Sequence, residues 1–346
     1  MKKVNIALVG CGGMAALYRH IYTEVPGAQL ALIIDINEEV AKSAAQTLQI
    51  ERWSTNFTDC LSPEIDVVDI STPNHFHRDQ AVAAMQAGKH VLLQKPLASN
   101  VAEAEHIVRT AGETGVIAGM YMSLFDNPVF YEIKDIINEG KLGVITGAHC
   151  RVAHTGGLTM DENNWRKSGE QTGGGSFIQL AIHNINMAQW LIDSRIISVS
   201  AYSHNLHCPN VGGDDMTVVA CEFNTGALGT ISSAYCANKD ELVIYGTKGY
   251  ISVDDTRHVS LRLSEARMGK LLPYDTPNMR KTFDLPFDSF TLFDSKNPCD
   301  QHVAFIKAVQ ANEPPQIHVS VGLYDMKIVQ AVYESARQEK RVYIKD

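Results

Sequence analysis

The chain has 346 residues, of which 45% are hydrophobic and 20% charged. This composition is typical of globular proteins, and the length favours two domains over one core. The net charge of −9 argues against nucleic acid as a partner, because phosphate binding needs clustered Lys and Arg. No apolar stretch approaches the roughly 20 residues of a membrane span, so we expect no membrane contact. Seven scattered cysteines without a C-x-x-C pair fit free thiols in a reducing cytoplasm.

Strand-length apolar runs alternate with segments of helical period as far as residue 121. The runs lie at 4–9, 29–34, 66–71, 90–93 and 116–120, and the helical segments at 14–24, 37–48, 77–87 and 99–114. Such strands indicate a parallel sheet covered by helices on both faces. We therefore predict an α/β fold whose first domain, residues 1–121, is a doubly wound Rossmann sheet. Asn37 is expected to cap one helix and Gly88 to end another.

Beyond residue 121 the pattern predicts an α+β domain, residues 122–346. Helices are expected at 127–138, 175–193, 300–311 and 322–338, and a strand at 144–155. Further strands joined by short turns between residues 197 and 255 predict an open, mainly antiparallel sheet. The helix at 322–338 is expected to pack back on the first domain. The segment 265–298 is rich in proline and aromatic residues, and we expect it to cover the site or a neighbouring subunit.

A glycine turn follows the first strand and opens a helix. In Gly10-x-Gly12-x-x-Ala15, the first glycine makes the turn and the second lets the backbone approach a pyrophosphate, with Gly13 and Met14 at the helix start. Asp35 ends the second strand, where a carboxylate would hold the adenosine ribose hydroxyls, with Ile36 beside it. A carboxylate there repels a 2′-phosphate, so NAD is predicted over NADP. The alternative is a plain turn, with Asp35 acting as a helix cap.

Two polar loops follow the next strands of the series. Thr72, Asn74 and His77 lie in "STPNHFH", and Gln94 and Lys95 in "LLQKPLASN". In doubly wound sheets ligands lie beyond the carboxyl ends of the strands, so we expect these side chains to line the cofactor cleft. The Lys95 ammonium is placed to bond a substrate hydroxyl and stabilise alkoxide charge. A proline-led turn and an ordinary surface lysine are the alternatives.

A polar stripe interrupts the apolar helix predicted at 175–193. Gln179, His183 and Asn186 are spaced by four and three residues, which places them on one face of an α-helix. Histidine is the side chain best suited to proton transfer at neutral pH. We expect the stripe to face a bound nicotinamide; for an isolated histidine, a satisfied core residue would be the better interpretation.

The order of these motifs resembles a known family. The glycine turn, "TPNH", "QKP", "NNWR", "GGG…H" and "YGTKG" follow one another as in the glucose–fructose oxidoreductase/inositol dehydrogenase (Gfo/Idh/MocA) family. The resemblance covers essentially the whole chain. It implies NAD(P)-dependent oxidation of a ring hydroxyl of a sugar or inositol, and a homodimer or homotetramer formed through the open sheet. It also implies catalytic roles for Lys95 and His183.

The chain departs from the family pattern at three acidic positions, which are Gln94, Gln179 and Asn186 here. Amides keep hydrogen bonding but give up charge. Their presence should lower the pKa values of Lys95 and His183, which suits a general base. A negatively charged substrate would also fit, with Arg166 as its partner.

The hypothesis is hydride transfer between NAD and a carbinol carbon. His183 moves the hydroxyl proton, and Lys95 orients the oxygen. Gln179, Asn186, Trp165 and Arg166 hold the substrate ring. One alternative is a redox-neutral elimination with tightly held NAD; another is a non-catalytic NAD-binding regulatory protein. No metal is expected, because "HNLHC" at 204–208 lacks a second ligand group. "GDD" at 213–215 is interpreted as a simple turn.

Overall fold

The computed structural model describes residues 3–254, 259–263, 280–283 and 296–345. The chain divides into two compact units. The first comprises Met1–Asn127, Glu170–Gly173 and Thr291–Met326, and the second Pro128–Gly169, Gly174–Phe290 and Lys327–Asp346. This division differs from the predicted boundary after residue 121, because two later segments cluster with the first unit. Most of the segment 265–298, expected to cover the site or a subunit, lies outside the described residues.

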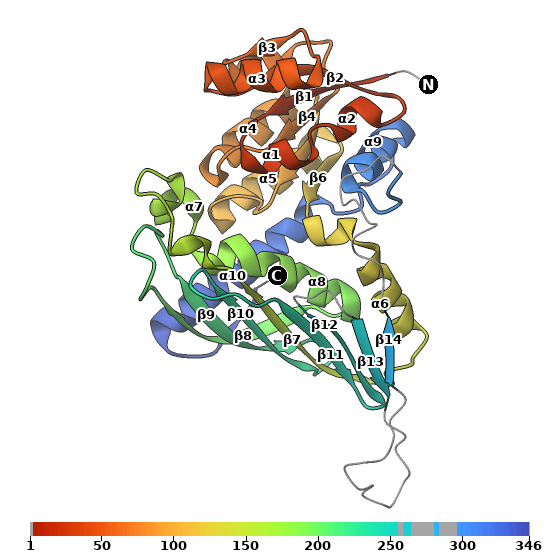
Figure 1. Cartoon of the computed structure of the whole chain (residues 1–346), viewed down its shortest axis with the longest axis vertical. Helices are drawn as coiled ribbons and strands as arrows, with labels where there is room; N and C mark the ends of the chain where they lie inside the picture. The colour runs from red at the N-terminus through yellow and green to blue at the C-terminus, as the bar shows by residue number, and fades with distance from the viewer. Residues whose placement is uncertain (1–2, 255–258, 264–279, 284–295, 346) are drawn as a thin grey trace, which may run out of the picture. The chain divides into compact units, whose positions relative to one another are not determined.

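The first unit is built on a six-stranded sheet in the order β3-β2-β1-β4-β5-β6 (Figure 1). All neighbouring strands are parallel, and the order is that of a Rossmann fold, which confirms the prediction. The order reverses between β1 and β4, so the carboxyl ends of these strands form the expected ligand-binding edge. The strands are β1 (Val4–Val9), β2 (Ala28–Ile34), β3 (Trp53–Ser54), β4 (Val67–Ile70), β5 (His90–Gln94) and β6 (Ala118–Tyr121).

The helices of this unit begin and end close to the predicted residues. The side chain of Asn37 accepts hydrogen bonds from two amides of α3, and Gly88 has a φ of +76°, as predicted for a helix end. The helix expected over 14–24 is instead two helices, because Thr23 bonds back to the carbonyl of His20 through both its amide and its hydroxyl. The helices are α1 (Gly13–Tyr18), α2 (Ile21–Glu24), α3 (Glu38–Leu48), α4 (Asn74–Gln86) and α5 (Val101–Thr114).

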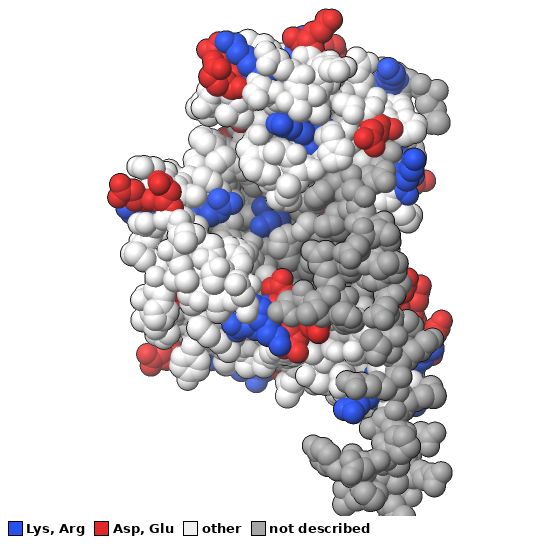
Figure 2. Space-filling model, viewed as in Figure 1, with Lys and Arg blue, Asp and Glu red and all other residues white. Residues whose placement is uncertain are grey.

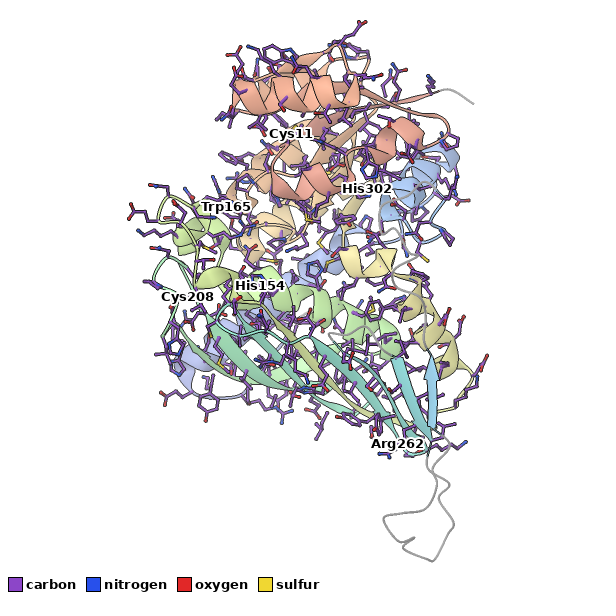
Figure 3. The ribbon with its side chains drawn as sticks, in the orientation of Figure 1. Cys11, His154, Trp165, Cys208, Arg262 and His302 are labelled. Atoms are coloured by element: carbon purple, nitrogen blue, oxygen red, sulfur yellow. The ribbon has the colours of Figure 1, made fainter. Side chains whose placement is uncertain are left out.

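A late segment returns to the first unit through α9 (Gln301–Ala311). Its His302, labelled in Figure 3, is fully buried. The His302 ring stacks on Tyr18 at 4.1 Å between centroids and lies 4.6 Å from the Tyr121 ring. The Tyr18 hydroxyl donates to the buried Asp69 carboxylate. These contacts explain why a segment distant in sequence clusters with the Rossmann sheet.

The second unit contains a nine-stranded sheet in the order β14-β13-β12-β11-β7-β10-β9-β8-β15. Only β7 and β10 are parallel neighbours, and the other pairs are antiparallel. This confirms the predicted open, mainly antiparallel sheet. The strands are β7 (Ile145–Ala153), β8 (Ile196–His204), β9 (Met216–Phe223), β10 (Leu228–Ala234), β11 (Glu241–Gly246), β12 (Gly249–Asp254), β13 (Val259–Leu263), β14 (Arg280–Phe283) and β15 (Val342–Tyr343).

One face of this sheet carries the helix with the polar stripe (Figure 1). That helix consists of a π-helical segment, η5 (Phe177–Ala181), followed directly by α8 (Ile182–Ile192). α6 (Pro128–Asn138) belongs to the same unit, whereas α10 (Val319–Gln338) continues from the first unit into the second. The opposite face exposes large apolar side chains, including Tyr202, Leu228 and Tyr343.

Charged side chains of both signs lie on the described surface. On the face drawn in Figure 2, the described Lys and Arg side chains are interspersed with Asp and Glu and do not form one basic patch. Within the described residues, no helix has both the length and the apolar character needed to cross a membrane. All seven cysteines are free thiols, as predicted.

Candidate functional site

The glycine turn is shaped by the loop that follows β4. Gly10 has a φ of +86°, and a Cβ built on it would lie 2.7 Å from the carbonyl oxygen of Ser71, so only glycine fits. At Gly12 and Gly13 a Cβ would meet no atom within 4 Å. Gly12 begins α1 without any side-chain capping bond. The turn is therefore compatible with the close approach of a dinucleotide pyrophosphate.

Asp35 lies directly after β2 and is held by the glycine turn. Its Oδ2 accepts a hydrogen bond from the Cys11 amide at 2.8 Å, and its Oδ1 accepts one from the Asn37 amide at 2.9 Å. The next residue, Ile36, is 88% exposed. Burial and the nearby Asp35 carboxylate raise the pKa of the Cys11 thiol to about 12, so the Cys11 thiol (Figure 3) stays neutral. A carboxylate has further lone pairs for the predicted ribose contact.

The loop after β4 is tied to the loop after β5 by His77. This side chain is fully buried, and its Nδ1 and Nε2 lie 2.9 Å from the carbonyl oxygens of Pro96 and Thr72, respectively. Both carbonyls favour the protonated ring, but burial outweighs them and lowers the pKa of His77 to about 4. The neutral ring can donate only one of the two bonds. His77 therefore holds the two loops, and its direct contact with the cofactor stays a prediction.

Two further polar side chains after β4 are engaged by the protein. The Thr72 hydroxyl donates to Gln80 Oε1 at 2.6 Å. The Asn74 amide, 3% exposed, donates to the carbonyl of Thr172 at 2.8 Å. These contacts fix the loop at the ligand-binding edge of the sheet. Cofactor contacts by Thr72 and Asn74 stay predictions.

Lys95 lies one residue beyond the end of β5. Because β4 and β5 are parallel neighbours, their carboxyl ends bring this loop and the Thr72 loop to one edge. Lys95 is half-buried, and its amide donates to Gln94 Oε1 at 3.1 Å. Gln94 is 7% exposed, and its Nε2 has no hydrogen-bond partner within the described residues. A buried amide nitrogen of this kind is a donor available to a ligand.

The second unit holds the predicted stripe, but on a helix that differs from the prediction. The continuous α-helix expected over 175–193 is wrong for Phe177–Ala181, which form a π-helical segment with one more residue in the turn. Gln179 and Asn186 are each 4% exposed, whereas His183 is half-buried. The imidazole is thus the more accessible member of the three. Local π-helical segments recur at functional sites.

The loop after β7 contains the predicted Trp165 and Arg166. The Arg166 guanidinium carbon lies 4.6 Å from the centre of the Trp165 ring, within the distance of a cation–π contact. Arg166 is half-buried and makes no salt bridge within the described residues. Burial raises the pKa of the Tyr235 hydroxyl to about 12, and the positive charge of Arg166 partly offsets this rise.

Two residues that the motifs did not single out lie in this region. His154 and Tyr235 directly follow β7 and β10, which are parallel neighbours in register, so the two strands end side by side. Their ring centroids are 5.0 Å apart, and Figure 3 labels His154 beyond the end of its strand. The sequence alone contains no local signal of this pairing. Within the described residues, no group of three or more His, Cys, Asp or Glu side chains could hold a metal ion.

Two family models match the chain over most of its length. The model of the oxidoreductase family, NAD-binding Rossmann fold, matches residues 4–122, and that of its C-terminal alpha/beta domain matches residues 134–344. The chain belongs to this family. The match confirms the predicted Gfo/Idh/MocA resemblance, the assignment as an oxidoreductase and NAD as the cofactor. The predicted roles of individual site residues remain predictions.

The chain is similar to relatives of known name and to a solved structure. The chain is 29% identical over 274 residues to scyllo-inositol 2-dehydrogenase (NAD(+)) of Bacillus subtilis, covering 77% of this chain and 78% of the relative. It is 30% identical over 259 residues to 2,7-anhydro-N-acetylneuraminate hydratase of Escherichia coli, covering 72% and 68%. A solved structure of levoglucosan dehydrogenase, in complex with NADH and levoglucosan, superposes with a TM-score of 0.89 at 22% identity and full coverage of both chains.

Proposed function

We propose that the protein transfers hydride between NAD and a CH–OH carbon of a sugar, sugar derivative or inositol. The observation that carries this proposal lies in the first unit. The Gly10 turn, Asp35 and Lys95 follow three strands of one parallel sheet, at the edge where such sheets bind dinucleotides. An ammonium at that edge suits an oxygen that gains negative charge.

In this proposal the chain itself supplies binding, orientation and proton transfer. Bound NAD supplies the capacity to accept or return the hydride. His183 takes the hydroxyl proton during oxidation and returns it during reduction. Lys95 orients the reacting oxygen and stabilises its developing charge. Gln179 and Asn186 bind substrate hydroxyls through their amides, and Trp165 and Arg166 hold the ring from the loop after β7.

A redox-neutral reaction is the second candidate function, and a specific observation favours it. Three positions that are acidic in the resembled pattern are the buried amides Gln94, Gln179 and Asn186. One relative at 30% identity is a hydratase by name. In such a reaction a transient oxidation would acidify the neighbouring C–H bond, a group would be eliminated, and the sugar would be reduced again. The same His183 would then serve as base and acid in one turnover.

We propose further that the chain works in the cytoplasm as a homodimer or homotetramer. The sheet face that α8 leaves uncovered carries Tyr202, Leu228 and Tyr343, which are 78%, 65% and 62% exposed. Apolar side chains gathered on one uncovered face favour association with another copy. Free thiols fit a reducing compartment.

The test uses the purified chain with NAD and a panel of neutral sugars, sugar acids and inositols. Dehydrogenation predicts that NADH accumulates in step with an oxidised product. A product that forms with no net NADH, from protein that already holds NAD, would favour the redox-neutral alternative. If no member of the panel is converted, whereas NAD still binds, the non-catalytic regulatory interpretation replaces both.

A further inference from the structure

The helix that bears His183 begins without a cap of its own. Ser176, directly before η5, makes no side-chain capping bond to the helix, and Gly173–Gly175 offer no side chain. The amides of a first helical turn have no partners within the helix and need acceptors from elsewhere. Here the acceptor is Asp214, which lies 39 residues beyond Gly175 in the chain.

The Asp214 side chain is 6% exposed and accepts hydrogen bonds from five donors. Three of them belong to residues 175–177, where the helix starts, and two come from other parts of the second unit. The donors are the Gly175 amide (3.1 Å), the Phe177 amide (2.9 Å), the Ser176 hydroxyl (2.7 Å), the Thr217 hydroxyl (2.8 Å) and the Tyr333 hydroxyl (2.8 Å).

Among the described residues, the charge of this carboxylate has no cationic partner. Within the described residues, no Lys, Arg or His lies within salt-bridge distance of Asp214. A buried carboxylate is instead stabilised by its donors and by the positive end of the helix. Burial and the Asp214 charge hold the pKa of Tyr333 well above its usual value, so its hydroxyl remains a donor.

The backbones on either side of this contact are interlocked. A Cβ on Gly175 would lie 1.9 Å from the Asp214 carbonyl oxygen, and one on Gly213 would lie 2.3 Å from the Gly175 amide nitrogen. The Asp214 carbonyl also accepts the Ser176 amide at 2.7 Å. The glycines therefore allow the two segments to approach, and the carboxylate fixes how they meet.

The geometry points to Asp214 as the positioning residue of the helix that carries the proton-transfer group. This inference rests on the proposed role of His183. Asp214 fixes residues 175–177. The π-helical segment that contains Gln179 begins at Phe177, and His183 lies in the turn after that segment. A group that is misplaced by about 1 Å can lose on the order of 10² in rate. Asp214 thus acts on the reaction through the placement of the helix and has no contact with the substrate.

A double-mutant cycle tests this inference, with kcat, the dissociation constant of NAD and the melting temperature as readouts. Asp214→Asn keeps the shape of the side chain but removes its charge and replaces one acceptor by a donor. We expect it to lower kcat at least about 10-fold and to change NAD affinity less than about 2-fold, because the cofactor residues belong to the first unit. In a His183→Ala background it should have little further effect on kcat, since residues that act as one unit are not additive.

Asp215→Asn is the matched control. Asp215 is the next residue, is fully buried, and accepts amides of residues 206–208 instead of the helix start. It should lower the melting temperature while leaving kcat within about 3-fold of wild type. If Asp214→Asn does not yield folded protein, Ser176→Ala is the second variant. It removes the hydrogen bond from the Ser176 hydroxyl to Asp214 and should also lower kcat, by a smaller factor.

The inference is overturned if Asp214→Asn keeps wild-type kcat, or lowers it no more than Asp215→Asn does. It is also overturned if Asp214→Asn lowers kcat by the same factor in the His183→Ala background as in the wild-type protein. The proposed function fails separately, if His183→Ala alone retains wild-type turnover.

Discussion

The carboxylate of Asp35 accepts a hydrogen bond from the amide of Cys11 at 2.8 Å. One oxygen of the group predicted to hold the cofactor ribose therefore also fixes the turn predicted to hold its pyrophosphate. The Asn37 amide binds the other oxygen, so the carboxylate has a defined orientation before any ligand binds. Because both contacts use backbone amides, they add hydrogen bonds without adding a positive charge that would attract a 2′-phosphate.

Asp35→Asn should weaken NAD binding and reduce the preference for NAD over NADP. The amide loses the charge that bonds the ribose hydroxyls and repels a 2′-phosphate, so we expect the KM for NAD to rise at least about 10-fold. Glu38→Gln, which removes an equal charge from the first turn of α3, should change that KM less than about 2-fold. The measurement is the KM of both cofactors. A wild-type enzyme that prefers NADP would contradict the assignment.

Gly175→Ala should strongly destabilise the protein. The new Cβ would overlap the Asp214 backbone, so the free energy of unfolding should fall by at least about 3 kcal/mol. Gly112→Ala in α5 is the control, because its Cβ would meet no atom within 4 Å; it should raise stability by roughly 0.5–1 kcal/mol. Denaturant unfolding measures both. Equal stability of the two variants would show that the two loops do not approach as described.

Stability should fall in acid through His77. Its pKa is lowered from 6.5 to about 4, so the unfolded chain binds the proton more readily and stability is lost as the pH falls from about 6.5 towards 4. The shift corresponds to a loss of about 3 kcal/mol. His77→Gln, which cannot titrate, should lack this part of the fall, and His106→Gln should keep it. Indistinguishable pH profiles for His77→Gln and wild type would contradict the buried neutral ring.

His183→Ala should lower turnover at least about 10²-fold if the imidazole moves the proton. NAD affinity, measured by calorimetric titration, should stay within about 2-fold of wild type, because the residues predicted to bind NAD belong to the first unit. Loss of NAD binding in this variant would instead indicate a structural role for the side chain.

The parts of the fold that depend on local patterns could be predicted from the sequence. The strand-length apolar runs predicted the long strands of the first unit, and Asn37 and Gly88 predicted two helix ends. The strand Trp53–Ser54 has only two residues, which is too short for a recognisable pattern of apolar and polar residues. The π-helical segment was missed because its apolar residues fit an α-helix equally well.

The parts of the site that depend on long-range contacts could not be predicted. "GDD" has the composition of a turn. Two of the five donors to Asp214 are backbone amides, which leave no trace in the sequence, and the Tyr333 hydroxyl lies 119 residues away along the chain. His154 and Tyr235 meet because two strands pair in parallel, 81 residues apart at Thr230 and His149. The glycine turn, Lys95 and the helix of His183 could be found because each has a motif of its own.

The most direct test of the central claim follows the hydrogen atom itself. A substrate from the panel, deuterated at its reacting carbon, is incubated with NAD and the wild-type protein, and the cofactor is analysed by mass spectrometry and NMR. The account predicts NADH that carries deuterium at C4, formed at least about 10²-fold more slowly by His183→Ala. Product that forms while the cofactor never acquires the label would contradict it.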